Sequence, residues 1–270
     1  MIEARACAKV NLALVVGPLR ADGKHEVVTV YQRVELSDDV SLEPATALSV
    51  TGFPDDAMVT AALESLAAEA RVAPDWHVRI TKRIPVAAGL GGGSSDAAAA
   101  LLLANSVLDE PLGRERLHGL ASALGADVPF FLTDRPQLGA GDGTVLQELD
   151  LPQGYGVLLV LPHGERKEST ASVYRAFDER GGEAGFEERR RELLEVLDGV
   201  RTVDDLARLP RNDLASSRLS SRLEALGALR SDVSGAGPAV YGLFGTADGA
   251  AAAAEAVADA GATFVTTACC

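Results

Sequence analysis

A glycine-rich segment that runs directly into an alanine-rich apolar segment is the feature that most constrains this chain. It spans residues 85–103 and reads PVAAGLGGGSSDAAAALLL. Its glycines let successive backbone N–H groups surround an anion in conformations that other residues resist. Ser94 and Ser95 stand where a helix needs N-caps, and the helix dipole adds partial positive charge there. The segment therefore predicts a phosphate-binding loop, and the simpler alternative is a hinge before a core helix.

The expected loop has no lysine of its own. A Walker loop needs a lysine and then serine or threonine after its last glycine, but Gly93 is followed by Ser94 and Ser95. The dinucleotide-binding fingerprint also fails, because its third glycine position, counted from Gly89, holds Ser94. Positive charge for a polyphosphate must then come from backbone amides, a metal ion or basic residues elsewhere. The basic candidates are Lys9, Lys82 and Arg83.

The charge balance argues against a nucleic-acid partner. The chain carries 39 acidic and 25 basic residues, and a net charge of −14 repels nucleic acid unless basic residues cluster. The densest basic run, 189–191, is flanked by glutamates and is typical of a solvated helix face. No apolar run reaches the length of a membrane span, and the N-terminus lacks the apolar core of a signal peptide. Cys7, Cys269 and Cys270 lack metal-binding spacing, so we expect a reduced, cytoplasmic environment.

Hydrophobic periodicity predicts an α+β protein, and 270 residues are enough for two compact lobes. The expected strands cover 10–16, 28–36, 78–80, 157–161, 239–244 and 263–267. The expected helices cover 58–70, 96–108, 114–124 and 247–260, with Gly125 as a C-cap and further charged helices up to Leu226. We expect one domain over 1–150 and a second over 151–270.

Three separated segments resemble the ordered motifs of the GHMP small-molecule kinases. They are AKVNLALVVGPLRADGKHEVVTVYQ at 8–32, PVAAGLGGGSSDAAAA at 85–100 and SGAGPAVYGLF at 234–244. The resemblance implies a two-lobed α+β fold, with an N-terminal lobe like domain 2 of ribosomal protein S5 and a ferredoxin-like C-terminal lobe. It also implies ATP with Mg²⁺. The implied ATP-binding residues are Pro85, Val86, Ala87, Ala88, Gly89, Leu90, Gly91, Gly92, Gly93, Ser94 and Ser95.

The opening motif is similar to that of family members which phosphorylate the 2-hydroxyl of a cytidine diphosphate-linked methylerythritol, in non-mevalonate isoprenoid biosynthesis. For this branch, the resemblance implies that Asp127 in GADVPFF is the catalytic base. On its sequence alone, Asp127 is equally a turn or N-cap aspartate before Pro129. Lys9 is the implied catalytic partner, because an ammonium keeps a carboxylate ionised and stabilises charge on the transferring group.

The substrate side also follows from the resemblance. The implied substrate-binding residues are Asn11, Lys24, His25, Tyr31, Thr170 and Tyr174. His25 matches a histidine that contacts cytosine, and the two tyrosines match aromatics that stack on that base, although either tyrosine could be a core residue. Lys24 departs from the family, which has an aromatic there, and Ala57 replaces an asparagine near the adenine.

Several alternatives stay open. Lys24 keeps alive a GHMP kinase with a different acceptor alcohol, and a catalytically silent metabolite-binding relative is the rival from another class. The segment 234–240 either supports the first glycine segment, touches phosphate, or is a tight turn into the last strands. Ser95 is a candidate magnesium ligand, but no acidic pair identifies itself as the ligand set. We expect a monomer or a homodimer.

Overall fold

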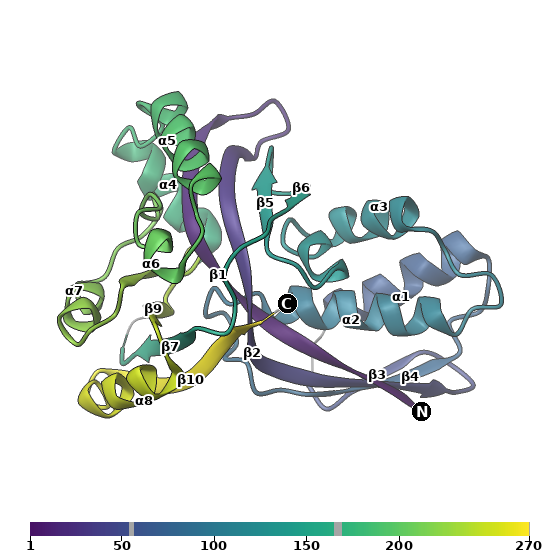
Figure 1. Cartoon of the computed structure of the whole chain (residues 1–270). Helices are drawn as coiled ribbons and strands as arrows, with labels where there is room; N and C mark the ends of the chain where they lie inside the picture. Colours follow the sequence, from purple (N-terminus) through teal and green to yellow (C-terminus); the bar gives the residue numbers. More distant parts are fainter. Residues whose placement is uncertain (54–56, 165–168, 270) are drawn as a thin grey trace. The chain divides into compact units, whose positions relative to one another are not determined.

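The computed structural model describes residues 1–53, 57–164 and 169–269, so Cys270 lies outside it. The chain forms two compact units, each built from separate stretches (Figure 1). Unit 1 comprises Met1–Ala8, Leu36–Val86 and Gly91–Asp134, and unit 2 comprises Lys9–Glu35, Ala87–Leu90 and Arg135–Cys270. The first two strands and the glycine-rich segment therefore contribute residues to both units. A division at residue 150 stays a prediction.

The strands of unit 1 form one side of its core. They are the start of β1 (Ile2–Leu19), the end of β2 (His25–Pro44), β3 (Ser49–Thr51) and β4 (Trp76–Thr81). β2 runs antiparallel to β4, with Val40 opposite Ile80 and Leu42 opposite Val78. These four side chains are all buried, since alternate residues of a strand point to the same face. β3 pairs with β4 in parallel.

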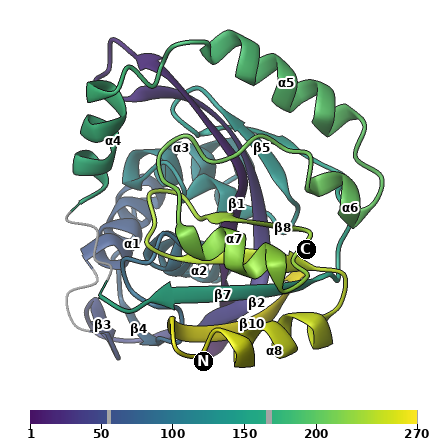
Figure 2. The same cartoon turned by 90° about the vertical axis from the view of Figure 1, so that its left-hand side faces the viewer.

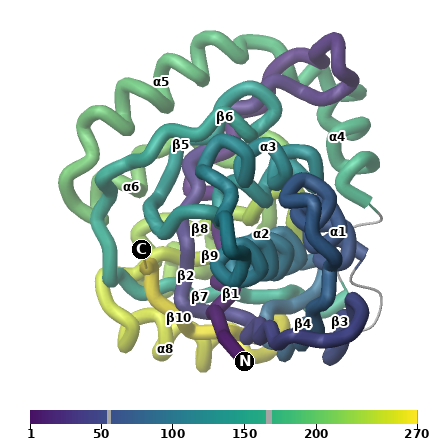
Figure 3. Tube along the Cα trace, turned by 90° about the vertical axis from the view of Figure 1, so that its right-hand side faces the viewer, coloured from purple at the N-terminus to yellow at the C-terminus, as the bar shows by residue number. Residues whose placement is uncertain are grey.

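The helices of unit 1 cover these strands, and α1 lies beside α2 (Figure 3). They are α1 (Ala57–Ala70), α2 (Gly92–Ser106), α3 (Arg114–Leu124) and the short 3₁₀ helix η1 (Pro129–Leu132). The structure confirms the expected helices over 58–70 and 114–124, and Gly125 is the C-cap of α3. Ten of the fifteen residues of α2 are buried, as expected of a helix in which residues 97–104 are all apolar.

The first turn of α2 differs from the sequence expectation. The helix begins at Gly92, four residues earlier than expected, and its N-cap is Gly91. Gly91 has a φ of 72°, in the left-handed region that glycine adopts without steric cost, and no side chain caps the helix. Ser94 and Ser95 lie inside the helix, so their assignment as N-caps was wrong.

Unit 2 is built on antiparallel strands. They are the rest of β1 (Ile2–Leu19) and of β2, then β5 (Gln137–Ala140), β6 (Val145–Glu148), β7 (Gly156–Pro162), β8 (Arg230–Val233), β9 (Val240–Phe244) and β10 (Gly261–Cys269). The order of neighbours is β2, β10, β7, β9, β8, while β5 pairs with β2 and β6. The strands β7, β9 and β10 match the expected ones. Four short strands among the described residues were not predicted: β3, of three residues, and β5, β6 and β8, of four residues each.

The helices of unit 2 are α4 (Thr170–Glu179), α5 (Phe186–Asp198), α6 (Val203–Leu206), α7 (Arg218–Ala225) and α8 (Ala247–Ala256). α7 packs against β8 and β9, and α8 packs against β7, β9 and β10 (Figure 2). Leu223 of α7 and Ala253 of α8 share one buried cluster with Leu158 and Val240. α4 packs on the β1–β2 hairpin through Phe177. None of the helices in the described part of the chain has the length and apolar character needed to span a bilayer.

Candidate active site

The short stretch Ala87–Leu90, part of the first glycine segment, is held by residues 234–240, which we call the second glycine segment. The carbonyl of Ala88 accepts the N–H of Ala239 at 2.9 Å, and the carbonyl of Gly89 accepts the hydroxyl of Ser234 at 2.9 Å. Gly89 has a φ of +85°, and a Cβ atom there would lie 2.3 Å from the Ser234 carbonyl oxygen. The contact therefore requires glycine. The second segment supports the first, which was one of the alternatives that the sequence left open.

Lys9 is the first residue of β1 that belongs to unit 2. Its N–H donates to the carbonyl of Leu90 at 2.9 Å, and its Nζ donates to Oδ1 of Asn11 at 2.6 Å. The ammonium also lies 5.6 Å from the centre of the Tyr31 ring. Lys9, Asn11 and Tyr31, three residues predicted for the site, are all buried and lie together. A charged side chain that is this buried must be compensated by such groups.

Thr29 orients Asn11, and sequence analysis missed it. Nδ2 of Asn11 donates to Oγ1 of Thr29 at 2.8 Å, and that hydroxyl donates to the carbonyl of Ala13 at 2.7 Å. With its amide nitrogen fixed, Asn11 turns its oxygen toward Lys9. The available signal was a threonine inside the run 27–31, VVTVY, whose other members are valines and a tyrosine.

The second glycine segment is itself anchored by Asn212. Nδ2 of Asn212 donates to the carbonyls of Val233 and Gly235 at 2.9 and 2.7 Å. Its backbone N–H donates to Asp232, whose carboxylate also contacts Arg230 at 3.2 Å. Burial raises the pKa of Asp232, and these bonds oppose that rise only in part. A buried polar network thus fixes the position of the segment.

His25 lies in a cluster made by α4. Its Nε2 is 2.8 Å from Oδ1 of Asp178, its ring stacks on Tyr174 at 4.8 Å and 29°, and Phe177 meets it edge-on at 5.9 Å. The structure thus brings together His25 and Tyr174, both predicted for the substrate. Thr170 is the first residue of α4 and is exposed.

The charge of Lys24, the residue before His25, is paired with a carboxylate. Its Nζ lies 2.5 Å from Oδ2 of Asp142, in the turn between β5 and β6. Partial burial acts to raise the pKa of Asp142, but hydrogen bonds from Lys24 and Thr144 outweigh it and lower the pKa to about 2. The ion pair ties the β1–β2 turn to the β5–β6 turn.

Because the folded-state pKa of Asp142 is depressed, its stabilisation is present above about pH 4 and is lost as pH falls toward 2. We expect Asp142→Asn to lower the free energy of unfolding at pH 7 by about 1 kcal/mol, since 52% of the Lys24 side chain is exposed and water screens the pair. Urea unfolding of both proteins at pH 7 and 3 measures the difference, which should narrow at pH 3. An equal difference at both pH values would exclude the ion pair as its source.

Asp127 belongs to unit 1, in the turn between α3 and η1. It is half-buried, and the turn is closed by the N–H of Val128, which donates to the carbonyl of Gly125 at 3.2 Å. Pro129 then begins η1. This turn geometry holds whether or not Asp127 acts as a base, and its pairing with Lys9, a residue of the other unit, stays a prediction.

Known proteins resemble this chain in both sequence and fold. Residues 57–135 match the model of the GHMP kinases N terminal domain, and residues 210–263 match that of the GHMP kinases C terminal domain. A protein of Rhodococcus jostii named 4-diphosphocytidyl-2-C-methyl-D-erythritol kinase is 40% identical over 96% of this chain and 89% of its own length. The chain belongs to the GHMP kinase family. A relative of the same name from Streptomyces avermitilis is 38% identical, over 96% of this chain and 93% of its own.

A solved structure titled 4-(cytidine 5′-diphospho)-2C-methyl-D-erythritol kinase matches this GHMP kinase with a TM-score of 0.81 and 32% identity, covering 100% of both chains. A mevalonate kinase matches with a TM-score of 0.75 but only 12% identity, so that likeness concerns the fold alone. The comparisons confirm the expected two-part α+β GHMP kinase fold, and the chain is an ATP-dependent phosphotransferase of this family.

Two of the three basic candidates in this GHMP kinase are bound to carboxylates. Lys82 contacts Asp38 and Asp96, and Arg83 contacts Asp39. Burial acts to lower the pKa of Lys82, but the hydrogen bonds to Asp38 and Asp96 outweigh it and raise the pKa. Sequence reasoning did not single out either carboxylate as a partner.

Ser95 is placed to receive a ligand at the start of α2. Its residue is 1% exposed, and its hydroxyl has no hydrogen-bond partner among the residues that the structure describes. A buried hydroxyl without a partner is costly unless a ligand or water satisfies it. Ser95 is not the N-cap of α2, and its role at a phosphate site stays a prediction.

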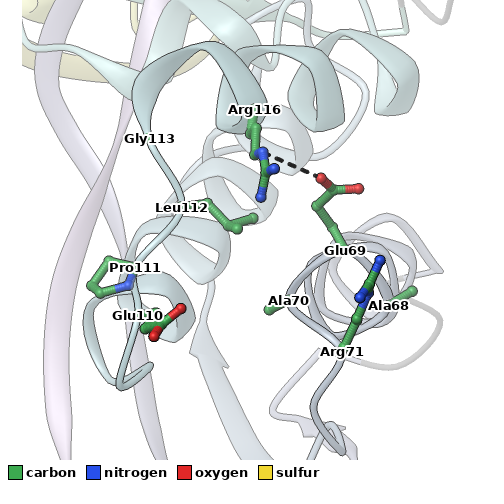
Figure 4. A pocket seen from close by; sticks show the side chains of 9 residues that line it. All are labelled: Ala68, Glu69, Ala70, Arg71, Glu110, Pro111, Leu112, Gly113 and Arg116. Carbon is green, nitrogen blue, oxygen red and sulfur yellow. Dashed lines mark ion pairs between the residues drawn. The ribbon is translucent and has the colours of Figure 1, made fainter.

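A separate pocket of about 660 Å³ lies in unit 1, between the end of α1 and the start of α3 (Figure 4). Its charged lining residues are Glu69, Arg71, Glu110 and Arg116, and Glu69 lies 3.6 Å from Arg116. The two positive and two negative charges balance. The pocket contains none of the predicted site residues, and we assign it no ligand.

Proposed function

We propose that this chain phosphorylates the 2-hydroxyl of 4-diphosphocytidyl-2-C-methyl-D-erythritol with ATP. The observation that carries the proposal is its similarity over nearly the whole length to relatives that bear this enzyme name. The pathway follows from the substrate, which belongs to non-mevalonate isoprenoid biosynthesis. A cytoplasmic location, a monomeric or homodimeric state and the lack of a nucleic-acid partner stay predictions.

The cluster around His25 supports a nucleobase as part of the substrate. The Tyr174 ring stacks on the imidazole at 4.8 Å, and an aromatic surface of this kind suits a flat base. Asp178 holds one imidazole nitrogen, so the other can serve a ligand. Lys24 is engaged by Asp142, which argues against a role in which it neutralises a diphosphate.

In the proposed reaction, the γ-phosphorus of ATP forms a bond with the acceptor oxygen while its bond to the β-phosphate oxygen breaks. Asp127 takes the proton of the attacking hydroxyl, and Lys9 stabilises negative charge on the phosphoryl group. The glycine segments hold the phosphates through backbone amides, in a loop that the Ser234 and Ala239 hydrogen bonds keep in one conformation. Asn11 and Tyr31 fix Lys9.

Mg²⁺ would enter with ATP and neutralise the developing phosphate charge. The hydroxyl of Ser95 fits this role, because it is buried without a partner among the described residues and hydroxyls of phosphate loops bind Mg²⁺. Those residues contain no group of three or more His, Cys, Asp or Glu that could hold a metal ion. Phosphate oxygens and water are therefore expected to supply the other ligands.

An ADP-release assay with purified protein, ATP, Mg²⁺ and several acceptor alcohols tests the proposal. We expect turnover with the diphosphocytidyl substrate and none with mevalonate or homoserine. A preference for another alcohol would show that the chain is a kinase with a different acceptor. Binding of nucleotide without turnover on any acceptor would favour a metabolite-binding relative.

A further inference from the structure

Three charged residues form a buried cluster in unit 1, which we call the Lys82 triad: Lys82, directly after β4, Asp38 of β2 and Asp96 of α2. Nζ of Lys82 lies 2.5 Å from Oδ2 of Asp38 and 2.6 Å from Oδ2 of Asp96. Both carboxylates are fully buried, and only 14% of the lysine side chain is exposed. Charges this buried are retained in one geometry, because breaking the pairing leaves a charge without compensation.

Asp38 fixes the triad to the strands. Its Oδ1 accepts the backbone N–H groups of Arg83 at 2.5 Å and Ile84 at 2.8 Å, so one side chain of β2 holds the residues that lead into the glycine loop. Together with the bond from Lys82 to Asp96, four hydrogen bonds hold residues 82–84: three from these residues to Asp38 and one to Asp96. Asp38 is rigid because each of its oxygens has a partner.

Asp96 fixes the triad to the helix. It lies one turn after Gly92, the first residue of α2, and a Cβ atom at Gly92 would come within 3.3 Å of Nζ of Lys82. The ammonium is thus packed against the turn whose free N–H groups would receive phosphate. Any movement of Lys82 or Asp96 would move that turn relative to β2.

The charges of the triad do not suit a phosphate-neutralising role. Two carboxylates against one ammonium leave an excess of negative charge, and the neighbouring Arg83 is matched by Asp39. Such a cluster does not attract a polyphosphate. We propose that Lys82 is a positioning residue, which ties the first turn of α2 to β2 through Asp96 and Asp38 and so sets the geometry of the nucleotide loop.

Asp96→Ala and Asp96→Asn test this role. Alanine removes the ion pair between Lys82 and residue 96 and leaves Lys82 paired with Asp38, so the remaining buried charges balance. Alanine also favours the helical conformation of α2. Asparagine keeps an oxygen that can accept from Lys82, so it should rescue part of the effect. We expect Asp96→Ala to weaken ADP binding about tenfold, in line with the loss of a charged hydrogen bond, and Asp96→Asn to fall in between.

The readouts are the Kd for ADP by titration calorimetry, the KM values for ATP and for the acceptor, and thermal unfolding. We expect the KM for ATP to rise while the KM for the acceptor stays unchanged. Asp39→Ala is the matched control, since it removes the neighbouring exposed pair with Arg83, and it should leave the Kd for ADP unchanged. If Lys82 instead neutralised phosphate, removal of the competing Asp96 would tighten ADP binding.

The inference rests on the proposed nucleotide-dependent function, and the outcomes separate the two. An active parent protein whose Asp96 variants bind ADP as tightly as the parent, or more tightly, overturns the inference alone. Lower thermal stability with an unchanged Kd for ADP also overturns it, because that pattern denotes a purely structural role. If Asp96→Ala does not fold, the Kd of Asp96→Asn decides. A parent that binds no ADP overturns both proposals.

Discussion

Replacing Asp127 by asparagine is expected to lower kcat about a hundred- to ten-thousandfold, because the amide cannot take the proton of the attacking hydroxyl. The residue lies half-buried in the turn after α3, where asparagine suits the same backbone. The Kd for ADP should therefore stay close to that of the parent. Single-turnover phosphorylation and ADP titration measure the two effects separately.

Asp109→Asn is the matched control for this change, since Asp109 is an exposed carboxylate of the same unit. The Asp109→Asn protein should turn over at the rate of the parent. A near-parental kcat for Asp127→Asn would show that Asp127 is not the base and that it serves only to form the turn between α3 and η1.

Lys9→Ala should also lose most of its turnover. The variant additionally loses the buried contacts of Lys9 with Asn11 and Tyr31, so its stability should fall as well.

Replacing Gly89 by alanine is expected to be the most damaging change in the glycine loop. The new Cβ would lie 2.3 Å from the carbonyl oxygen of Ser234, and the φ of +85° is strained for any other residue. Strain of this kind costs about 1–3 kcal/mol before the clash is counted. The two glycine segments must therefore separate, and we expect a lower melting temperature together with a large rise in the KM for ATP.

Gly154→Ala separates the two causes. Gly154 has a similar φ of +74°, but a Cβ atom there would meet nothing within 4 Å. This variant should lose about 1 kcal/mol of stability and keep its KM for ATP. Equal behaviour of the two variants would show that the backbone conformation, and not contact with Ser234, explains the loss at Gly89.

Periodicity and glycine spacing were enough to predict the helices α1 and α3 and the main strands of this fold. α3 could be bounded because Gly125 ends it, and residue types that favour one conformation carry such information locally. The start of α2 was missed for the opposite reason. Its cap is Gly91 in a left-handed conformation, and a run of glycines does not reveal which one adopts it. Strands as short as β5 have too few residues for alternation to stand out.

Much of the candidate site was identified by residue type, but the hydrogen bonds and ion pairs between its residues were not. Lys9 and Asn11 were predicted from the resemblance of the first motif, and they lie two residues apart on the same face of one strand. The partners of Lys82 lie 44 and 14 residues away, and that of Lys24 lies 118 residues away. Only the fold decides which of many carboxylates each lysine meets. Thr29 and Asp178 were missed for the same reason.

The hydrogen bonds from Ser234 and Ala239 to the first glycine segment also bear on how the chain matures during synthesis. They join residues about 150 positions apart in sequence, as shown by the 145-residue separation of Ser234 and Gly89. Contacts of such long range form late, because much chain must be ordered before they close. A growing chain that ends before Ser234 has no partner for Gly89. The ability to bind nucleotide should therefore arise only after Ser234 has been synthesised, and a product truncated before Ser234 should be inactive even if its N-terminal helices have formed.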